Sequence, residues 1–143
     1  MKKVSNILTR KGSNVAAIDG STTVLEALKL MSDKSIGSVV ITEEGVYAGL
    51  LTERDYARKV VLHGKSSLQT QVREIMSTHF PKMTPENSVE TCMHVMSESN
   101  IRYLPIFNKD DQLCGIISIS DVVTETILEN EETIEQLKTY IQS

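Results

Sequence analysis

Apolar and polar residues follow two different periods along this chain, and the order of the periods repeats. Apolar residues at helical spacing predict a helix from about Val24 to Lys34. A run rich in β-branched residues predicts a strand over residues 36–41, and a turn then returns the chain as a hairpin partner over residues 46–51. A further helix is expected over residues 54–62. The predicted unit is therefore helix, strand, strand, helix.

The same unit occurs again later in the chain. A shift of 65 positions superimposes the apolar faces of helix and strand, pairing Val24 with Val89, Ala27 with Cys92, Leu28 with Met93, Met31 with Met96, Ile36 with Ile101 and Ile41 with Ile106. After one extra turn residue the shift becomes 66, which pairs Gly49 with Gly115, Thr52 with Ser118 and Asp55 with Asp121. Agreement of helix faces, strands and corner predicts an internal duplication.

The remaining segments frame the two repeats and complete the expected domain organisation. We expect a lead-in helix over residues 1–14, the first motif over 15–64, a helical connector packed on the core over 65–79, the second motif over 80–128 and a C-terminal helix extension over 129–143. The predicted fold class is α/β (α+β), because helices and short strands alternate within each repeat.

The C-terminal helix carries a heptad-like apolar seam. Its members follow one another at spacings of 4, 3, 4, 3 and 4 residues, and they are Val123, Ile127, Asn130, Ile134, Leu137 and Ile141. One interpretation is a long helix that covers its own core, and the other is a seam for self-association. The sequence favours neither.

Composition and charge exclude several classes of protein. The 143 residues are 40% apolar and 24% charged, with a net charge of −4, which argues against a broad nucleic-acid surface. No apolar run approaches the roughly 18 residues that a membrane-spanning helix needs. The start lacks a secretory apolar core, so a cytoplasmic location is expected, with an amphipathic organelle-targeting segment as the open alternative. Cys92 and Cys114 have no metal-ligand spacing, and reduced, buried thiols are expected.

The chemistry of the chain is expected at the two corners where a strand leads into a helix, residues 49–55 (GLLTERD) and 115–121 (GIISISD). A hydroxyl three residues before a carboxylate has the spacing of a capping box, which would be purely structural. A ligand site is the alternative, because a glycine inside a strand marks close approach of another backbone or a ligand. The free amides of a helix start also favour phosphate, and a carboxylate can accept from both hydroxyls of a ribose.

Basic residues near the first corner bear on the same question. Arg54 and Arg58 lie one helical turn apart, with Lys59 and Lys65 close in sequence. This cluster indicates a phosphate contact, and a solvated helix face is the alternative. Arg102 interrupts the start of an apolar strand and is a second phosphate candidate, unless it forms a structural ion pair.

The repeated unit resembles the cystathionine-β-synthase-type (CBS) motif, and the tandem pair resembles a Bateman module. The resemblance covers nearly the whole chain, and its most specific pieces are residues 36–40 (IGSVV), 49–56 (GLLTERDY), 101–106 (IRYLPI) and 115–121 (GIISISD). It implies two β-α-β-β-α units whose sheets pack with pseudo-two-fold symmetry. Residues 65–76 further resemble small stand-alone CBS-pair proteins.

The resemblance also implies a ligand and its contacts. Such pairs bind adenosine-containing ligands such as AMP, ADP, ATP, NAD(H) or S-adenosylmethionine in clefts between the repeats, with no catalytic cofactor and no metal. The residues it implies are Asp55 and Asp121 for the ribose, with Thr52 and Ser118 beside them, Arg54 and Arg102 for phosphates, and Val15, Phe80, Ile36, Gly37, Ser38 and Tyr103 around the base or phosphates. Arg58 of the basic cluster and Ser120 of the second corner complete the predicted nucleotide-binding residues.

The chain departs from the family pattern in ways that predict two unequal sites. The second corner has Ser120 where the first has Arg54, so the phosphate affinities should differ. Close relatives often carry arginine and histidine where this chain has Asn100 and Tyr103, and tyrosine is uncharged at neutral pH.

The expected function is that of a regulatory, energy-sensing module: nucleotide binding would shift a homodimer or partner interface and modulate an unidentified protein. The alternative is a ligand-independent dimeric scaffold that recruits partners through its C-terminal helix. An enzyme is not expected, because His63, His79 and His94 are scattered and no nucleophile has a recognisable base. Any regulated catalytic or transport activity is expected to lie in another polypeptide, and neither nucleic acid nor a membrane is an expected partner.

Overall fold

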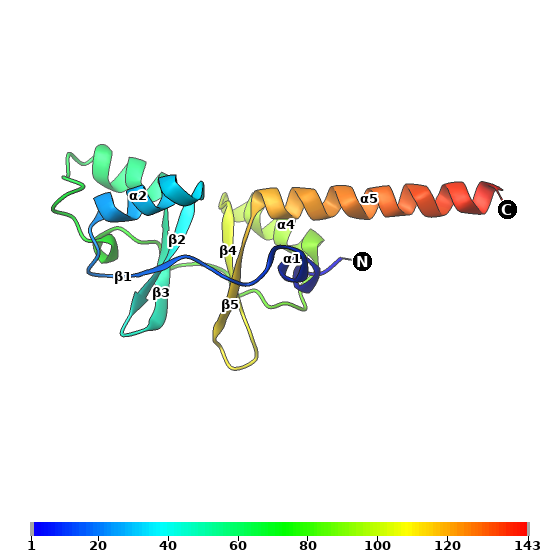
Figure 1. Ribbon diagram of the computed structural model, residues 1–143, viewed down its shortest axis with the longest axis horizontal. Helices are drawn as coiled ribbons and strands as arrows, with labels where there is room; N and C mark the ends of the chain where they lie inside the picture. The colour runs from blue at the N-terminus through cyan, green and yellow to red at the C-terminus, as the bar shows by residue number, and fades with distance from the viewer. Residues whose placement is uncertain (1, 143) are drawn as a thin grey trace. The chain divides into compact units, whose positions relative to one another are not determined.

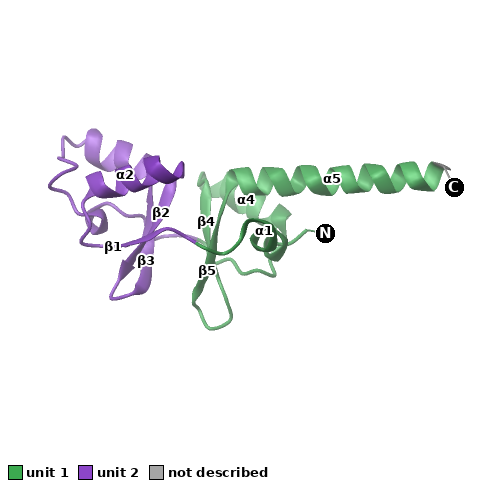
Figure 2. Ribbon diagram, in the orientation of Figure 1, with its two compact units in different colours: residues 1–14, 81–143 green, residues 15–80 purple. Residues whose placement is uncertain are grey.

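The computed structural model describes residues 2–142 and divides the chain into two compact units. Unit 2 is Val15–Phe80, and unit 1 combines Met1–Asn14 with Pro81–Ser143 (Figures 1 and 2). Each unit contains one of the two predicted repeats. The start of the chain therefore belongs with the second repeat, an assignment that the sequence interpretation did not make.

Unit 2 is a three-stranded sheet with helical segments. Its elements are β1 (Ala17–Asp19), α2 (Val24–Lys34), β2 (Ser38–Glu43), β3 (Val46–Thr52), α3 (Glu53–Tyr56), the π-helical segment η1 (Ala57–Val61) and the 3₁₀ turn η2 (Val72–Glu74). β1 pairs with β2 in parallel and β2 with β3 antiparallel. Apolar side chains from the sheet, α2, η1 and η2 form one buried cluster that includes Val39, Ile41, Leu51 and Ile75.

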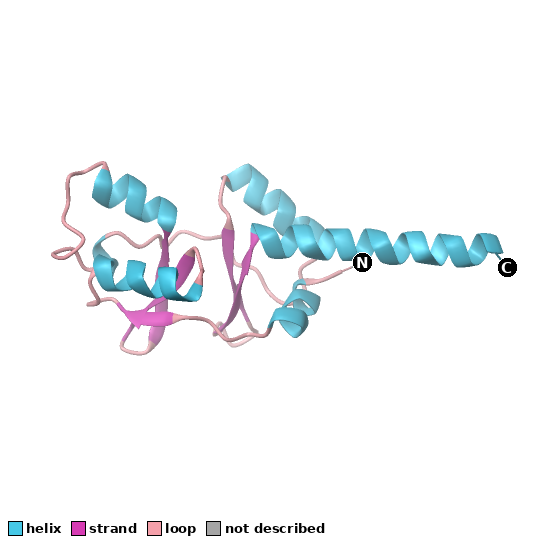
Figure 3. Ribbon diagram, turned by 45° about the horizontal axis from the view of Figure 1, so that its top comes forward, coloured by secondary structure: helices cyan, strands magenta, loops and turns pink. Residues whose placement is uncertain are grey.

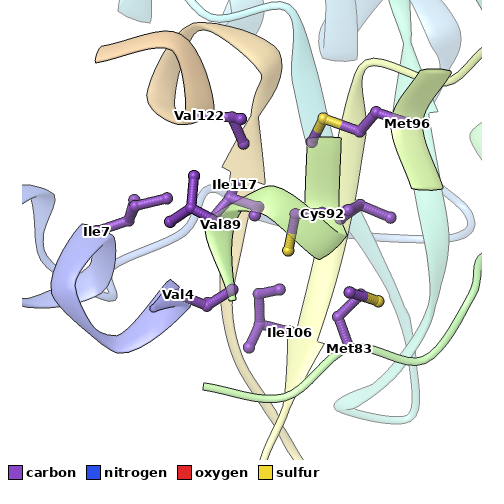
Figure 4. Packing of buried hydrophobic residues seen from close by; sticks show 10 residues of the cluster. Val4, Ile7, Met83, Val89, Cys92, Met96, Ile106, Ile117 and Val122 are labelled. Atoms are coloured by element: carbon purple, nitrogen blue, oxygen red, sulfur yellow. The ribbon is translucent and has the colours of Figure 1, made fainter. Parts of the chain in front are cut away.

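Unit 1 repeats this plan with a smaller sheet and a longer final helix. Its elements are α1 (Val4–Lys11), α4 (Val89–Ser99), β4 (Tyr103–Phe107), β5 (Leu113–Ser118) and α5 (Ile119–Gln142), and β4 pairs antiparallel with β5. Figure 4 shows the core, where Val4 and Ile7 of α1 lie beside Val89, Ile117 and Val122. The mixed α+β fold with a long C-terminal helix confirms the predicted fold class.

The duplication extends to fine detail of the backbone. α2 and α4 begin after the N-cap hydroxyls of Thr23 and Ser88, each of which accepts a hydrogen bond from an amide three residues later. Both helices end at a residue in the left-handed region, Ser35 with φ 54° and Asn100 with φ 52°. Irregularities also interrupt the ladders at equivalent points, after Ile41 and after Ile106.

The first strand of the second repeat is reduced to a single bridge. The resemblance to the CBS motif implies a strand before the second repeat's first helix, around Phe80, but the structure has one parallel bridge there, between Met83 and Ile106. Pro81 and Pro85 lie on either side of Met83, and neither can donate to a strand ladder. This is why unit 1 has two strands where unit 2 has three.

The helical connector predicted over residues 65–79 is wrong for most of its length. Only Val72–Glu74 is helical, as one 3₁₀ turn, and Leu68 is 68% exposed although it stands at helical spacing from the buried Val72 and Ile75. The backbone of Ser77 instead exchanges two hydrogen bonds with Leu50 of β3. Pairing with a sheet edge requires extended backbone, which overrides the helical spacing of the apolar residues.

Two short segments occupy equivalent places in the two units. Lys3 forms an antiparallel bridge with Ser88, and Gln71 forms one with Thr23. The apolar residues that follow them are buried in the same two cores: Val4 and Ile7 in unit 1, Val72 and Ile75 in unit 2. The segment at Lys3 precedes the first repeat in sequence but packs in unit 1, which contains the second repeat. The segment at Gln71 precedes the second repeat but packs in unit 2, which contains the first repeat. The duplication thus begins earlier than residues 15 and 80.

α5 is one continuous helix that includes both the end of the second repeat and the C-terminal extension. Its first turns face the core through Val122 and Glu125, whereas its second half runs on beyond the other elements of unit 1 (Figures 1 and 3). Within residues 2–142, no helix combines the length and the apolar character needed to cross a membrane.

Candidate functional site

The first corner is a complete capping box. Thr52 is the N-cap of α3, and its Oγ1 accepts a hydrogen bond from the Asp55 amide at 3.1 Å. Asp55 Oδ2 accepts from the Thr52 amide and from the Thr52 hydroxyl, both at 3.0 Å. The capping interpretation of the sequence is therefore confirmed here, and it accounts for one of the two carboxylate oxygens.

The other oxygen of Asp55 is also occupied. Oδ1 accepts from the Ser77 hydroxyl at 2.6 Å and lies 3.0 Å from the Lys59 ammonium. Lys59 also donates to the Ile75 carbonyl at 2.9 Å, so it ties α3 and η1 to the segment that carries Ser77. With 7% of its side chain exposed, Asp55 is a buried carboxylate surrounded by donors from its own unit. A ligand could reach it only by displacing one of these donors.

The second corner repeats the box and leaves one oxygen open. Asp121 Oδ2 accepts from the Ser118 amide at 2.8 Å, and the Asp121 amide donates to Ser118 Oγ at 3.2 Å. The Lys11 ammonium approaches the same Oδ2 at 2.7 Å and also donates to the Ile116 carbonyl at 3.0 Å. Asp121 Oδ1 receives no hydrogen bond from any residue between 2 and 142. The side chain is 16% exposed.

Asp121 is held in its ionised form by these contacts. Burial raises the pKa of this carboxyl group, but the hydrogen bonds from Lys11 and from the Ser118 amide and hydroxyl, with the charge of Lys11, outweigh burial. The net effect lowers the pKa of Asp121 below its ordinary value of 3.8. At neutral pH the open oxygen is therefore a charged acceptor.

The two strand glycines are sites of close approach, as the sequence predicts, and the neighbour in both cases is the chain itself. A Cβ on Gly49 would lie 2.6 Å from the Ser77 carbonyl oxygen. A Cβ on Gly115 would lie 2.6 Å from Cδ2 of Leu8. The glycines thus make room for the two equivalent segments, residues 72–77 and α1, that carry Ser77 and Lys11.

Backbone hydrogen bonds bring the predicted base-contacting segments to their corners. The Glu53 amide at the start of α3 donates to the Gly37 carbonyl at 3.2 Å. The Ile119 amide at the start of α5 donates in the same way to the Arg102 carbonyl at 2.9 Å. Ile36, Gly37 and Ser38, and likewise Ile101 to Tyr103, therefore lie beside the helix that opens each corner.

The residues predicted to contact phosphate differ in their exposure and in their partners. Arg54 is half-buried and Arg58 is exposed, whereas Lys59 of the same basic cluster is engaged by Asp55. Arg102 is exposed, and its guanidinium forms no hydrogen bond or ion pair with the residues that the structure describes. A structural ion pair for Arg102, the alternative from the sequence, is therefore not found among them. Val15, Phe80 and Tyr103 are half-buried.

Unit 1 contains a groove of about 720 Å³ between the end of α4 and the start of α5. Its lining residues are Met93, Met96, Ser97, Asn100, Ile101, Arg102, Ile119, Ser120, Val123 and Thr124. Arg102 and Ser120, both predicted from sequence, are thus brought together here. Ser118 and Asp121 are not part of this lining, because Asp121 is directed toward α1 through Lys11.

Sequence interpretation missed Lys11 and Ser77, and it assigned Lys59 to the phosphate cluster instead of to Asp55. Lys59 follows Asp55 by four residues, so the helical i,i+4 rule was sufficient to find it. Lys11 and Ser77 come from distant segments. A third shift, of 68 positions, superimposes Val4, Ile7 and Leu8 on Val72, Ile75 and Met76. This shift would have shown that the two segments that carry Lys11 and Ser77 are equivalent.

Comparison with known proteins agrees with this architecture. The CBS domain model matches twice, over residues 4–62 and 72–127. The chain belongs to the CBS-domain family. Both matches include the lead-in segment that precedes each repeat, which fits the structural equivalence of α1 and residues 72–77. CBS pairs of this kind are in general regulatory, ligand-binding modules.

Relatives of this CBS pair occur in a plant and in bacteria. The mitochondrial CBS domain-containing protein CBSX3 of Arabidopsis thaliana is 35% identical over 97% of this chain and 71% of its own length. A putative signal-transduction protein with CBS domains from Burkholderia ambifaria has a solved structure with 38% identity and a TM-score of 0.85, covering 89% of this chain and 95% of that chain.

A third relative has a defined assembly. A hexameric CBS-CP12 protein from bloom-forming cyanobacteria is 31% identical, with a TM-score of 0.73 over 85% of this chain and 66% of that chain.

Within residues 2–142 of the present CBS pair, no group of three or more His, Cys, Asp or Glu side chains could hold a metal ion.

Proposed function

We propose that this CBS pair is a regulatory sensor that binds an adenosine-containing nucleotide, among AMP, ADP, ATP and NAD(H), and passes the bound state to a partner protein. The observation that carries the proposal is the open, ionised oxygen of Asp121 at the start of α5. A ribose offers two adjacent hydroxyl donors, which suit such an acceptor. Asp55 occupies the same place in the duplicate corner.

The two corners are expected to bind with different affinities. At Asp121 a ribose hydroxyl can donate to Oδ1 without breaking an existing hydrogen bond. At Asp55 the ligand must replace the Ser77 hydroxyl or the Lys59 ammonium, which costs the free energy of that interaction. Arg54 beside Asp55 and Ser120 beside Asp121 add a second difference, since the arginine favours phosphate at the first corner.

Calorimetric titration with AMP, ADP, ATP, NADH and S-adenosylmethionine tests the proposal. We expect binding of at least one ligand, and a loss of about tenfold or more for Asp121→Asn, which keeps an acceptor for the Ser118 amide. Asp110→Asn, the same change at an exposed position in the turn between β4 and β5 and outside the groove, is the matched control in unit 1. Absence of binding to every nucleotide at millimolar concentration, or unchanged binding by an Asp55→Asn, Asp121→Asn double variant, contradicts the proposal.

The scaffold hypothesis is the second candidate, and the exposed apolar residues of α5 favour it. Ile134, Leu137 and Ile141 are at least half exposed in the single chain. In this hypothesis the two corners are only helix caps. Deleting residues 130–143 would then abolish association with partners, whereas nucleotides would change neither association nor stability.

Self-association fits both candidates. The hexameric cyanobacterial relative supports self-association. Self-association matters for a sensor because ligand binding can be coupled to it. A nucleotide changes an assembly only if it binds one arrangement more tightly than the other. We therefore propose a homodimer as the basic functional form and an unidentified regulated protein as its partner.

A further inference from the structure

α5 presents along its length an apolar seam whose apolar members are about half exposed or more in the single chain. Its exposed members are Val123 (49%), Ile127 (51%), Ile134 (50%), Leu137 (56%) and Ile141 (81%). They follow the spacing of a coiled-coil seam, with Asn130 completing the series. The opposite side of the first turns, at Val122 and Glu125, is buried against unit 1. Of the two interpretations left open by the sequence, a helix covering its own core therefore does not account for this face.

The seam needs a partner for a simple energetic reason. Every described side chain from Asn130 to Ile141 is exposed, and the ion pair between Lys2 and Glu132, 3.1 Å long, is a surface contact. Isolated helices shorter than about 12–15 residues are marginal in water, because packing of an apolar face supplies most helical stability. A helix that extends this far is expected to pack along that face.

We infer that two copies of this chain pair through α5 as a parallel, in-register, two-stranded coiled coil in which Asn130 faces Asn130 of the second copy. In heptad positions, Ile127, Ile134 and Ile141 occupy a, whereas Val123, Asn130 and Leu137 occupy d. Isoleucine at all three a positions and leucine at one d position, Leu137, follow the pattern that favours two parallel strands. The inference specifies the surface of the proposed homodimer and does not depend on nucleotide binding.

Asn130 selects the register. In the parallel, in-register pair the two side-chain amides meet and can hydrogen-bond to each other. Any shift, or an antiparallel pairing, places the amide against an apolar side chain and leaves a polar group unpaired in the seam. One polar residue in a short apolar seam thus costs some stability and excludes the alternatives.

The charges beside the seam permit this pairing. The g positions are Thr126, Thr133 and Tyr140, none of which is charged at neutral pH, and the e positions include Glu131 and Lys138. In a parallel pair each e residue faces a g residue of the second copy, so no like charges meet. Glu129, Glu132 and Glu135 lie on the outer positions c, f and b, where they keep the outer surface acidic.

The seam is continuous with further exposed apolar surface. Val123 belongs both to the seam and to the lining of the groove between α4 and α5. Ile119 and Met93 of the same groove are 43% and 39% exposed. A parallel pair brings the two copies of this groove to the same end of the coiled coil, so one interface covers the seam and extends to these residues.

Disulfide trapping tests the orientation and register. In a Cys114→Ser background, Asn130→Cys is expected to form a covalent dimer under mild oxidation, because facing d positions lie within disulfide reach. Gln136→Cys, six residues further along α5 at an outward c position, is the matched control and should remain monomeric on a non-reducing gel. Equal cross-linking of both variants overturns the inference. So does preferential cross-linking between Ile134→Cys and Leu137→Cys chains, which indicates an antiparallel pair.

Light scattering and calorimetry separate this inference from the proposed function. Ile134→Asp should weaken dimerisation about 100-fold or more, whereas Gln136→Asp on the outer face should not. Nucleotide affinity measured per chain should survive in an Ile134→Asp monomer that keeps its circular dichroism. A wild-type chain that is monomeric at high concentration overturns the seam and the homodimer together. A dimer that persists in Ile134→Asp overturns the seam alone.

Discussion

The two corners of this CBS pair share one sequence motif, Gly-x-x-Thr/Ser-x-x-Asp, but they lie in different surroundings. Both place a hydroxyl and a carboxylate three residues apart, and both close a capping box. At Asp55 the remaining oxygen is taken by Ser77 and Lys59, whereas at Asp121 it receives no hydrogen bond from residues 2–142. The motif therefore determines the cap, and the segment that packs over it determines whether the carboxylate is available.

The covering segments differ in how they reach the carboxylate. Residues 72–77 pair through their backbone with β3, which fixes the Ser77 hydroxyl close to Asp55. α1 instead packs through apolar side chains, and Lys11 reaches Asp121 with a long, partly exposed side chain. A short hydroxyl on a paired backbone is a more rigid partner than a lysine side chain. We therefore expect the second corner to adapt to a ligand more readily.

Replacing the carboxylates should produce the largest difference between the corners. Asp55→Ala removes the acceptor for the Thr52 amide, the Ser77 hydroxyl and Lys59 in a buried place, and is expected to lower the free energy of unfolding by about 3 kcal/mol. Asp121→Ala leaves Lys11 able to reach water, so about 1 kcal/mol is expected. Urea denaturation of both variants measures the difference. Equal losses would show that burial of Asp55 has no energetic consequence.

The strand glycines provide a second, smaller contrast. Gly49→Ala places a methyl group against the Ser77 carbonyl, which is held by the ladder with Leu50, and about 2 kcal/mol of destabilisation is expected. Gly115→Ala meets only the end of the Leu8 side chain, which can change rotamer, so the loss should stay below about 1 kcal/mol. Thermal and urea unfolding are the measurements. A reversed order would mean that α1 is packed more rigidly than residues 72–77.

The repeats could be predicted from the sequence because their signals are local. The capping residues Thr23 and Ser88, the helix faces and the β-branched strands all lie within a few residues of the structure that they specify. The predicted helix over residues 24–34 and the hairpin that follows it are confirmed by α2, β2 and β3. The two corner aspartates, Asp55 and Asp121, were found in the same way, because the motif that contains them occurs twice.

The errors and omissions arise from contacts between distant segments. Helical spacing in residues 65–79 was overridden by pairing of Ser77 with Leu50, and proline around Met83 reduced a predicted strand to one bridge. The placement of α1 in the unit of the second repeat depends on burial of Val4 and Ile7, which local patterns do not reveal. The assignment of individual side chains to ribose and phosphate stays a prediction.

The smallest expected effect concerns the pH dependence of stability at the second corner. Since the pKa of Asp121 in the folded protein lies below its ordinary value of 3.8, the ionised carboxylate stabilises the fold above that pH. This contribution is lost as the pH falls from 3.8 through the lower, folded pKa. Lys11→Gln removes one cause of the lowered pKa and should decrease stability at neutral pH by less than about 1 kcal/mol.

The difference between wild type and Lys11→Gln isolates this contribution. Asp19, whose pKa is lowered by hydrogen bonds from the Ser21 hydroxyl and amide, titrates in the same acidic range in both proteins and cancels. Unfolding followed from pH 7 into that range should therefore show two curves that converge as Asp121 becomes protonated. Parallel curves would assign the lowered pKa to the Ser118 cap instead. Lys11 would then lie beside the Asp121 carboxylate without contributing to its lowered pKa.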